Sequence, residues 1–551
     1  MEPRLRKSQT VSKSSSSPGV VFQPQVAQGF KRGIDVLVAA IRPTLGPLPR
    51  VVVLPRATIG PPEILDNGAV IARRILQLPD RDADAGAMFL RQLLWRQYER
   101  EGDGTATAAV LFQAVFARGL AYLAAGGNAM RLRFGLETAG QIVADALARQ
   151  AIPVAGREML RRVALAVCGE EALSDRLGEI FDIVGEYGQL EIRTERGRDL
   201  EREYVEGAYW QSGVLSWLLV DGQPRARVKL ENPAIFNSDL SFEEADQLVP
   251  VLRAAADAGH RALVIVANRI AKRAMSLLLA NNRAGALRVL AVKRPGGTLA
   301  EGSAAQEDLA YLTGAPVFPA QAQGELARLT AADFGRARTA WANRDYFGIV
   351  GGRGDPRALR AHIASLRAAC AQASEPEDRK RLRERIGRLM GGSAVLWLAA
   401  ATESEANFRK ELAQRTAEAV RGALLEGVLP GGGSALLACR KPLAEALAAE
   451  SDPDVGAGLR IASDALAEPL RVLAHNAGYE PAAVLAELAD AGPGYGFDVL
   501  SGRVVDMVQA GVLDAVTAQR AAAWRAIAGA GLALTTDVLV HHRHPAQEYN
   551  P

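Results

Sequence analysis

Residues 101–112 read EGDGTATAAVLF and place one acid, Asp103, between two glycines, directly before two threonines and an apolar run. From Thr105 to Leu120 apolar side chains recur on nearly every face, which is typical of a helix buried all round. The first turn of a helix carries unpaired N–H groups and the positive end of the helix dipole, so this polar start predicts an anion site. The alternative is that Asp103 and Thr105 simply cap the helix, and this stretch alone leaves both open.

Length and composition limit the class of protein. The chain has 551 residues, 49% hydrophobic and 23% charged, so we expect a globular protein of about three domains. Its 65 basic and 62 acidic residues are spread without a basic stripe, so nucleic acid is not an expected partner. Cys168, Cys370 and Cys439 lack metal-ligand spacing and indicate buried thiols in a reducing cytoplasm. No uninterrupted apolar run reaches the roughly 18 residues of a membrane span, so no membrane partner is expected.

Both ends of the chain resemble tails. Residues 1–21 are rich in serine and basic residues and lack an apolar signal region, so we expect disorder. A transit peptide is the alternative, although the amphipathic face of such signals is missing. Residues 541–551 contain His541, His542 and His544, which form either a solvated tail or a weak metal-binding tract.

The middle third has an α/β pattern. A helix is expected to open at Ser241 and Glu244, which have capping-box spacing, and to end at Gly259. The stretches ALVIVA at 262–267 and LRVLAV at 287–292 predict strands, with a second helix between them. Residues 360–392 predict a charged, solvent-facing helical hairpin.

Buried helical texture returns after this region and includes a glycine-rich break at Gly431–Gly433. A helical pattern, then an α/β pattern, then a helical pattern predicts one domain inserted into another. We therefore expect the two ends of the chain to share a domain.

Five motifs occur in a fixed order: PTLGP at 43–47, GDGTAT at 102–107, LPGGGSALL at 429–437, GYGFD at 494–498 and AGVLDA at 510–515. Together they resemble the group I chaperonins, the GroEL-like bacterial family. The resemblance implies a multidomain α+β fold with a mostly helical equatorial domain, a small intermediate domain and an α/β apical domain. The implied boundaries are 22–149 and 426–540 (equatorial, nucleotide-binding), 150–205 and 394–425 (intermediate, hinge) and 206–393 (apical, substrate-binding), with crossings near Gly207 and Gly392.

The resemblance also implies that ATP and Mg²⁺ bind to the equatorial domain. Asp103 would hold the metal, a hard cation that takes one or two carboxylates plus phosphate oxygens. The implied nucleotide-binding residues are Thr44, Leu45, Gly46, Pro47, Asp103, Gly104, Thr105, Ala106, Thr107, Gly432, Asp498, Val499, Leu500 and Asp514. Ala106 stands where the family has a threonine, and Asp498, Val499 and Leu500 replace an asparagine and two alanines. These larger side chains would narrow an adenine slot, so base preference is open.

Two acids that the family uses for hydrolysis are replaced. In EILDNG at 63–68 the family pattern reads lysine, aspartate, glycine, so the place of the acid falls on Asn67 while Asp66 lies one residue early. On the intermediate-domain helix the acid falls on Arg415. Neither side chain can act as a general base at neutral pH, so we expect ATP to bind but to be hydrolysed slowly or not at all. The alternative is that Asp66, Glu411 or Glu418 supplies the acid.

The apical positions that match the family surface for unfolded chains are all apolar: Val214, Leu218, Leu219, Val249, Leu252, Met275 and Leu279, with Trp217 where a proline is usual. They predict an exposed groove for non-native polypeptides, and burial in the core is the alternative for each. The resemblance further implies ring oligomers, two heptameric rings, and admits a cochaperonin. A non-hydrolysing holdase or a structural subunit of mixed rings is the alternative function.

Overall fold

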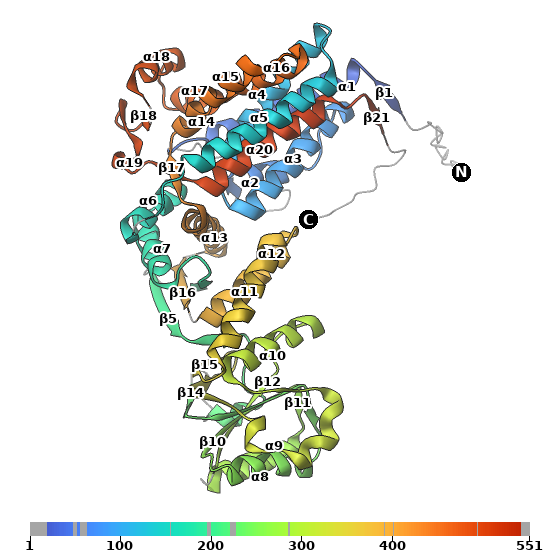
Figure 1. Ribbon diagram of the computed structural model, residues 1–551, viewed down its shortest axis with the longest axis vertical. Helices are drawn as coiled ribbons and strands as arrows, with labels where there is room; N and C mark the ends of the chain where they lie inside the picture. The colour runs from blue at the N-terminus through green and yellow to red at the C-terminus, as the bar shows by residue number, and fades with distance from the viewer. Residues whose placement is uncertain are drawn as a thin grey trace, which may run out of the picture. The chain divides into compact units, whose positions relative to one another are not determined.

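The computed structural model describes residues 19–47, 52–54, 63–154, 156–195, 200–220, 227–284, 287–390, 392–400, 402–492 and 494–541. The chain divides into two compact units, which are considered separately. Unit 1 consists of Met1–Ser174 and Arg415–Pro551, and unit 2 consists of Asp175–Gln414. The two ends of the chain therefore lie in one unit, with the middle of the sequence inserted (Figure 1). The finer division into three domains stays a prediction.

Unit 1 is mainly helical. Its described helices are α1 (Gln25–Ile41), η1 (Arg42–Thr44), α2 (Gly68–Arg74), α3 (Arg81–Glu101), α4 (Thr105–Ala124), α5 (Ala129–Arg149), α6 (Gly156–Cys168), α14 (Ser434–Ala438), α15 (Arg440–Ala449), α16 (Pro453–Ala465), α17 (Glu468–Asn476), α18 (Pro481–Ala491), α19 (Met507–Ala510) and α20 (Val516–Leu534). Two further helices, α7 (Glu171–Val184) and α13 (Glu403–Glu426), cross from one unit to the other.

The core of unit 1 forms around α4. This helix packs against α20, which also packs along α5, while α1 packs along α3. Buried side chains such as Leu111, Val115 and Phe116 lie on several faces of α4, as the sequence predicted. By length and composition α4 would also suit a membrane span, but half of its most apolar window is buried inside the unit. Its apolar character is therefore explained by packing.

Short antiparallel ribbons complete unit 1. They pair β1 (Val20–Phe22) with β21 (Val538–Val540), β2 (Val52–Leu54) with β3 (Glu63–Leu65), β17 (Val428–Pro430) with β20 (Leu513–Ala515) and β18 (Tyr495–Asp498) with β19 (Arg503–Asp506).

The β1–β21 ribbon corrects the expected boundaries of both tails. Residues 20 and 21, assigned to a disordered tail, pair with residues 539 and 540 at the opposite end of the chain. His541 extends this contact because its backbone N–H donates to Gly19 O at 2.8 Å and its ring bonds Asp82 Oδ1 at 2.6 Å. His541 is therefore part of the folded unit, and His542, His544 and residues 1–18 lie outside the described residues.

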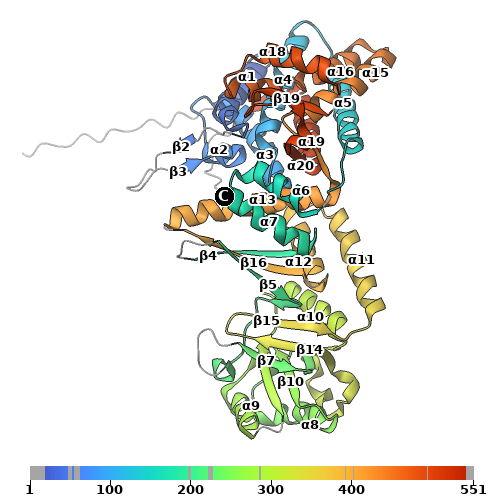
Figure 2. The same cartoon turned by 90° about the vertical axis from the view of Figure 1, so that its left-hand side faces the viewer.

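Unit 2 contains two sheets. The smaller one places β16 (Gly392–Ala399) between β4 (Gln189–Glu195) and β5 (Glu201–Glu206), parallel to β4 and antiparallel to β5 (Figure 2). The larger, mixed sheet has the order β12-β10-β8-β14-β15-β6, with β13 paired to β8 and β7 to β14. Its strands are β6 (Ala208–Trp210), β7 (Val228–Glu231), β8 (Ala234–Ser238), β10 (Ala262–Ala267), β12 (Arg288–Lys293), β13 (Val317–Phe318), β14 (Gly335–Ala342) and β15 (Phe347–Gly352).

The predicted α/β unit is present in the larger sheet. Strands β10 and β12 are parallel neighbours and are joined by α9 (Lys272–Ala284), as the strand and helix patterns predicted. The expected helix start is wrong, because Ser241 lies in β9 (Ser241–Phe242), which pairs with β11 (Arg269–Ile270). The capping box is formed instead by Glu244 and Gln247, and α8 (Val249–Asp257) follows.

The remaining helices of unit 2 are η2 (Trp217–Val220), η3 (Ala245–Gln247), α10 (Leu299–Thr313), η4 (Ala320–Arg328), η5 (Ala331–Asp333), α11 (Pro356–Gln372) and α12 (Pro376–Met390). Helices α11 and α12 pack together and form the predicted charged hairpin. A buried carboxylate of α10, Asp308, holds the hairpin. It bonds His362 of α11 at 2.9 Å, and its two oxygens accept from Arg385 of α12 at 2.7 and 2.9 Å. Such a fully paired buried charge fixes the position of the hairpin.

An aromatic cluster joins the two sheets of unit 2. It consists of Tyr209, Trp341, Tyr346 and Trp397, gathered around Glu191 and Arg193 of β4. Glu191 accepts hydrogen bonds from Arg193, from Tyr346 Oη at 2.9 Å and from Tyr209 Oη at 3.2 Å. The Arg193 guanidinium lies 4.5 Å from the ring centre of Tyr346 and 5.1 Å from that of Trp397. Burial would raise the pKa of Glu191, but these hydrogen bonds outweigh it and hold the pKa below its usual value.

Candidate functional site

The start of α4 is built by two glycines. Gly102 and Gly104 have φ angles of 71° and 79°, which favour glycine. A Cβ on Gly104 would lie 3.1 Å from Ala518 O, and one on Gly102 would lie 2.7 Å from Arg415 O. The turn therefore needs glycine both for its conformation and for the close approach of α13 and α20.

Helix α4 begins without a side-chain cap. Gly104 is its N-cap residue and makes no side-chain cap bond, so neither Asp103 nor Thr105 is the N-cap residue that the capping alternative requires. Thr105 and Thr107 are buried. The first turn of α4 thus keeps the N–H groups and the positive dipole end that an anion would use.

Two neighbouring elements converge on this turn. Gly68, at the start of α2, would carry a Cβ 3.2 Å from Thr105 Oγ1, so the two helix starts abut. The buried side chain of Gln97 donates from Nε2 to Asp103 O at 2.9 Å and to Ala518 O at 3.0 Å. Gln97 fixes the turn against α20, and no sequence motif pointed to it.

Asp103 and Asp514 form an electrostatically coupled pair. Burial raises the pKa of Asp103, and the Gly104 N–H and the charge of Arg415 oppose this rise. Burial and the charge of Asp103 raise the pKa of Asp514 to about 7, although Gln519 Nε2 donates to its Oδ2 at 3.0 Å. A bound cation would stabilise the ionised form of both carboxyl groups, so the donor chemistry of this pair fits Mg²⁺.

The number of protein ligands available to a metal is small. Among the described residues, no group of three or more His, Cys, Asp and Glu side chains could hold a metal ion. A divalent ion at Asp103 would therefore take most of its ligands from phosphate oxygens and water, as magnesium commonly does.

The two replaced acid positions have definite contacts. Asn67 is the N-cap residue of α2, and its Oδ1 accepts from the N–H groups of Ala69 at 2.9 Å and Val70 at 3.3 Å. Arg415 donates through Nη1 to Asp66 Oδ1 at 3.1 Å and through Nη2 to Asp66 Oδ2 at 2.7 Å. Burial would lower the pKa of Arg415, but Asp66 and the charge of Asp103 raise it. Asp66 is thus engaged by an arginine on both oxygens.

Two further acids of α13, Glu418 and Glu411, are alternatives for the missing acid. Glu418 accepts from Arg421 at 2.6 Å, and its Cβ would be 3.0 Å from a Cβ on Gly102. Glu418 therefore lies beside the turn before α4, whereas Glu411 belongs to unit 2. Substitution of the missing acid by Asp66, Glu411 or Glu418 stays an alternative prediction.

The first loop and the glycine-rich break lie in the same unit. Thr44 is buried and donates to Ile41 O at 2.8 Å, and Asn476 of α17 donates to Leu45 O at 2.9 Å. Gly46 has φ 123°, and Pro47 follows at the exposed end of the loop. Gly432 has φ 65°, and a Cβ there would lie 2.8 Å from Met507 Cε. Glycine at 432 therefore permits a close approach of backbone and α19.

The β18–β19 hairpin carries the residues expected near the base. Asp498 accepts from the N–H groups of Leu500 at 3.0 Å and Ser501 at 3.2 Å, so its carboxylate holds the hairpin turn. Val499 packs against the apolar cluster of α17, α18 and β18, and Leu500 is 62% exposed. Their effect on base recognition stays a prediction, as does that of the part-buried Ala106.

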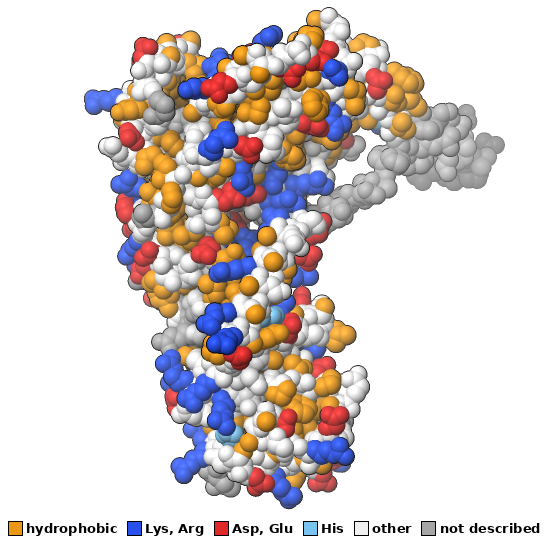
Figure 3. Space-filling view, viewed as in Figure 1, with side chains coloured by type: hydrophobic (Ala, Val, Ile, Leu, Met, Phe, Trp, Pro, Cys, Tyr) orange, Lys and Arg blue, Asp and Glu red, His pale blue; other side chains and the backbone are white. Residues whose placement is uncertain are grey.

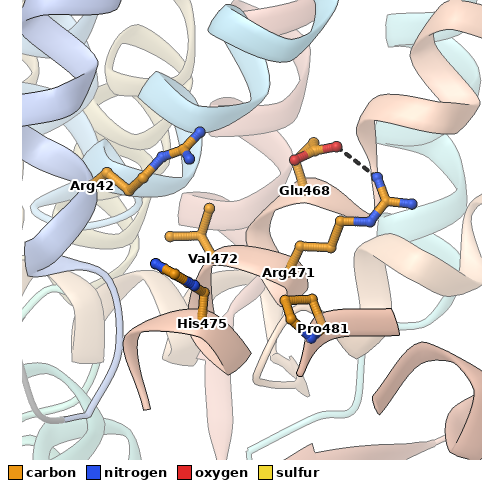
Figure 4. A pocket seen from close by; sticks show the side chains of 6 residues that line it. All are labelled: Arg42, Glu468, Arg471, Val472, His475 and Pro481. Carbon is orange, nitrogen blue, oxygen red and sulfur yellow. Dashed lines mark hydrogen bonds and ion pairs between the residues drawn. The ribbon is translucent and has the colours of Figure 1, made fainter. Parts of the chain in front are cut away.

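A hollow of about 200 Å³ lies between η1, α17 and the start of α18. It is lined by Arg42, Glu468, Arg471, Val472, His475 and Pro481 (Figure 4). Glu468 is bonded to Arg471 at 2.6 Å, and Arg42 extends to Gln113 at 3.1 Å. The charged side chains Arg42, Glu468 and Arg471 are therefore already engaged by protein groups.

A family model described as the TCP-1/cpn60 chaperonin family matches residues 37–544. The chain belongs to this family. Its fold also resembles the crystal structure of the chaperonin gp146 from the Pseudomonas aeruginosa bacteriophage EL, determined in the presence of ATP-BeFx. The match has a TM-score of 0.67 and 18% sequence identity, and covers 95% of this chain and 99% of the phage protein. The multidomain α+β chaperonin fold expected from the sequence is confirmed.

The expected polypeptide groove of this chaperonin needs correction at two positions. Leu219 and Met275 are buried in the core beneath α8 and α9, so the core alternative holds for them. Leu252 and Leu279 pack partly against the same core, while Val214 is part-buried near β12. Val249 is part-buried and Leu218 is 56% exposed. On the face drawn in Figure 3, apolar side chains of unit 2 are interspersed with charged ones.

Proposed function

We propose that this chaperonin chain binds ATP with Mg²⁺ in unit 1, captures non-native polypeptides in a ring-shaped chamber in the cytoplasm and hydrolyses ATP slowly or not at all. The observation that carries the nucleotide part is the uncapped start of α4 beside two part-buried acids, Asp103 and Asp514. Its N–H groups and the buried Thr105 and Thr107 would receive phosphate, and Asp103 would hold the metal. Bound Mg²⁺ would neutralise phosphate charge.

The proposal of weak hydrolysis is supported by the contacts at the two replaced positions. The amide oxygen of Asn67 is used as a helix cap, and an amide cannot take a proton from water. Arg415 is a permanent cation in an ion pair. Loss of a positioned general base costs on the order of 10² to 10⁴ in rate, so turnover should be low while binding persists.

The test compares ATP binding with steady-state ATP turnover on the purified full chain. We expect binding with little turnover, and a gain in turnover from the double change Asn67→Asp with Arg415→Asp. Aspartate can replace asparagine as the cap of α2, so the first change preserves the helix start. Ordinary family-level turnover in the unmodified chain, reduced by Asp66→Ala, Glu411→Ala or Glu418→Ala, would show that one of those acids acts instead.

A second candidate function is a holdase or a structural subunit of mixed rings, in which nucleotide drives no cycle. The Asp66–Arg415 ion pair favours this alternative because it fills an acid position with a fixed cation. Capture of a denatured model protein that is unaffected by ATP, together with ATP binding, would select it over a folding chamber. Release of the captured protein by ATP would select the chamber, whose apical movement would use glycine-containing hinges near Gly207 and Gly392.

A further inference from the structure

Arg415 is the group in the nucleotide site that the proposed function leaves without a positive role. Its side chain is 10% exposed and that of Asp66 is 20% exposed. Two parallel hydrogen bonds fix the guanidinium against the carboxylate, a geometry that holds an arginine in one orientation. The cation is therefore part of the built site.

The polarity of this ion pair is the reverse of the family pattern. The pattern has a lysine at the position of Asp66 and an acid at the position of Arg415. Here the acidic residue, Asp66, lies in the loop before α2, and the basic residue, Arg415, lies on α13. The loop and the helix still carry opposite charges, as in the family pattern, but the positive charge lies on α13 instead of in the loop.

Arg415 lies beside the candidate phosphate receptors. Its guanidinium bonds Asp66, two residues before Gly68, and a Cβ on Gly68 would be 3.2 Å from Thr105 Oγ1. A Cβ on Gly102 would be 2.7 Å from Arg415 O, so α13 touches the turn that starts α4. The charges of Arg415 and Asp103 act on each other. The positive end of α4, the threonine hydroxyls and a permanent cation thus share one site, and Asp66 engages only two of the five guanidinium N–H groups.

A fixed guanidinium also changes what a metal contributes. Arginine binds phosphate through several N–H groups at once, without needing an ion between protein and ligand. A divalent cation at Asp103 would lie beside the same guanidinium, so part of the phosphate charge that the metal would neutralise is already met by Arg415. The arrangement therefore reduces the share of phosphate binding that depends on the metal.

We propose that Arg415 is the resident cation of this site and binds the nucleotide phosphates directly, so that nucleotide affinity depends on Arg415 more than on Mg²⁺. This inference rests on the proposed nucleotide binding. Asp66 orients the guanidinium when no nucleotide is bound, and it competes with phosphate for the guanidinium. Removal of Asp66 should therefore strengthen nucleotide binding, and removal of Arg415 should weaken it.

The test measures ATP affinity by calorimetry, once with Mg²⁺ and once with a chelator. For the unmodified chain we expect the chelator to weaken binding by less than about tenfold. The reason is that Arg415, and not the metal, would make the main contact with phosphate. Asp66→Asn should bind more tightly in both conditions. The double variant Asp66→Asn with Arg415→Gln should lose roughly 10- to 100-fold in chelator, the range for hydrogen bonds to charged groups, and should regain part of this loss with Mg²⁺.

The double variant is the main probe because it removes both charges of the ion pair at once and leaves neither partner as an unpaired charge, so the fold should be kept. Arg520→Gln is the matched control, since Arg520 pairs with Glu426 at 2.6 Å at the far end of α13 and should not affect binding. Circular dichroism and thermal unfolding would check each variant. Equal affinity of the unmodified chain and the double variant in chelator would overturn the inference and leave nucleotide binding standing. Absence of ATP binding by the unmodified chain in both conditions would overturn the proposed function itself.

Discussion

At the scale of single residues, Asp514 has the largest consequence for pH dependence. It precedes α20 and its pKa is raised to about 7 by burial and by the charge of Asp103. In the unfolded chain this residue ionises near pH 4, which is a lower pH than in the folded chain. Neutral Asp514 therefore contributes stability at acid pH, and this contribution is lost as the pH rises from about 4 through about 7.

The prediction is that Asp514→Asn removes this loss. An asparagine keeps an oxygen that can accept from Gln519 and carries no charge to bury. The difference in unfolding free energy between variant and unmodified chain should grow with pH by up to a few kcal/mol and become constant above about pH 7. Urea unfolding across this range, without nucleotide or divalent cation, measures it. Parallel stability curves for the two proteins would contradict the shifted pKa.

Residue chemistry also explains what the sequence could and could not predict about the site. GDGT predicted the polar start of α4 because its glycines and threonines are adjacent in sequence. Asn67 lies before a helix, a position where asparagine is preferred as a cap, so its actual contact was readable locally. The meeting of Arg415 with Asp66, and of Gln97 with Ala518, joins positions hundreds of residues apart, and no local pattern specifies such pairs.

At the scale of elements, burial separates the residues of the expected polypeptide groove. Helical spacing predicted an apolar face on α8 and α9, but the same spacing serves the core and a surface equally. Met275 contacts the core under the sheet, whereas Leu218 on η2 is exposed. The ends of the chain likewise could not be predicted from a local pattern. The strands β1 and β21 are three residues long and pair across almost the whole sequence.

The prediction at this scale concerns Leu218 and its neighbours. Leu218→Glu should weaken capture of a denatured model protein and leave folding intact, because a charge in an exposed apolar surface opposes burial of the client. Leu252→Glu and Leu279→Glu should weaken capture too, with some loss of stability, because both side chains pack partly on the core. Met275→Glu is the contrasting control and should yield little soluble protein. Unchanged capture by soluble Leu218→Glu would exclude this surface.

At the scale of the whole molecule, assembly is the main expectation. The family match extends over residues 37–544. Because ring contacts belong to the equatorial domain in the resembled family, we predict rings, two of them with seven subunits each. Light scattering at micromolar concentration should give the mass of such an assembly. A stable monomer would remove the ring chamber and favour the holdase.

The aromatic cluster of unit 2 has an optical consequence. Two of the six tryptophans of the chain, Trp341 and Trp397, lie where the smaller sheet meets the larger one, and the Arg227 guanidinium lies 3.3 Å from the ring centre of Trp341. Indole emission responds to neighbouring charge and to solvent. Any displacement of one sheet against the other would separate Trp397 of the smaller sheet from Tyr209 and Trp341 of the larger one. The two indoles therefore report on this joint by fluorescence, and its movement can be timed without an attached dye.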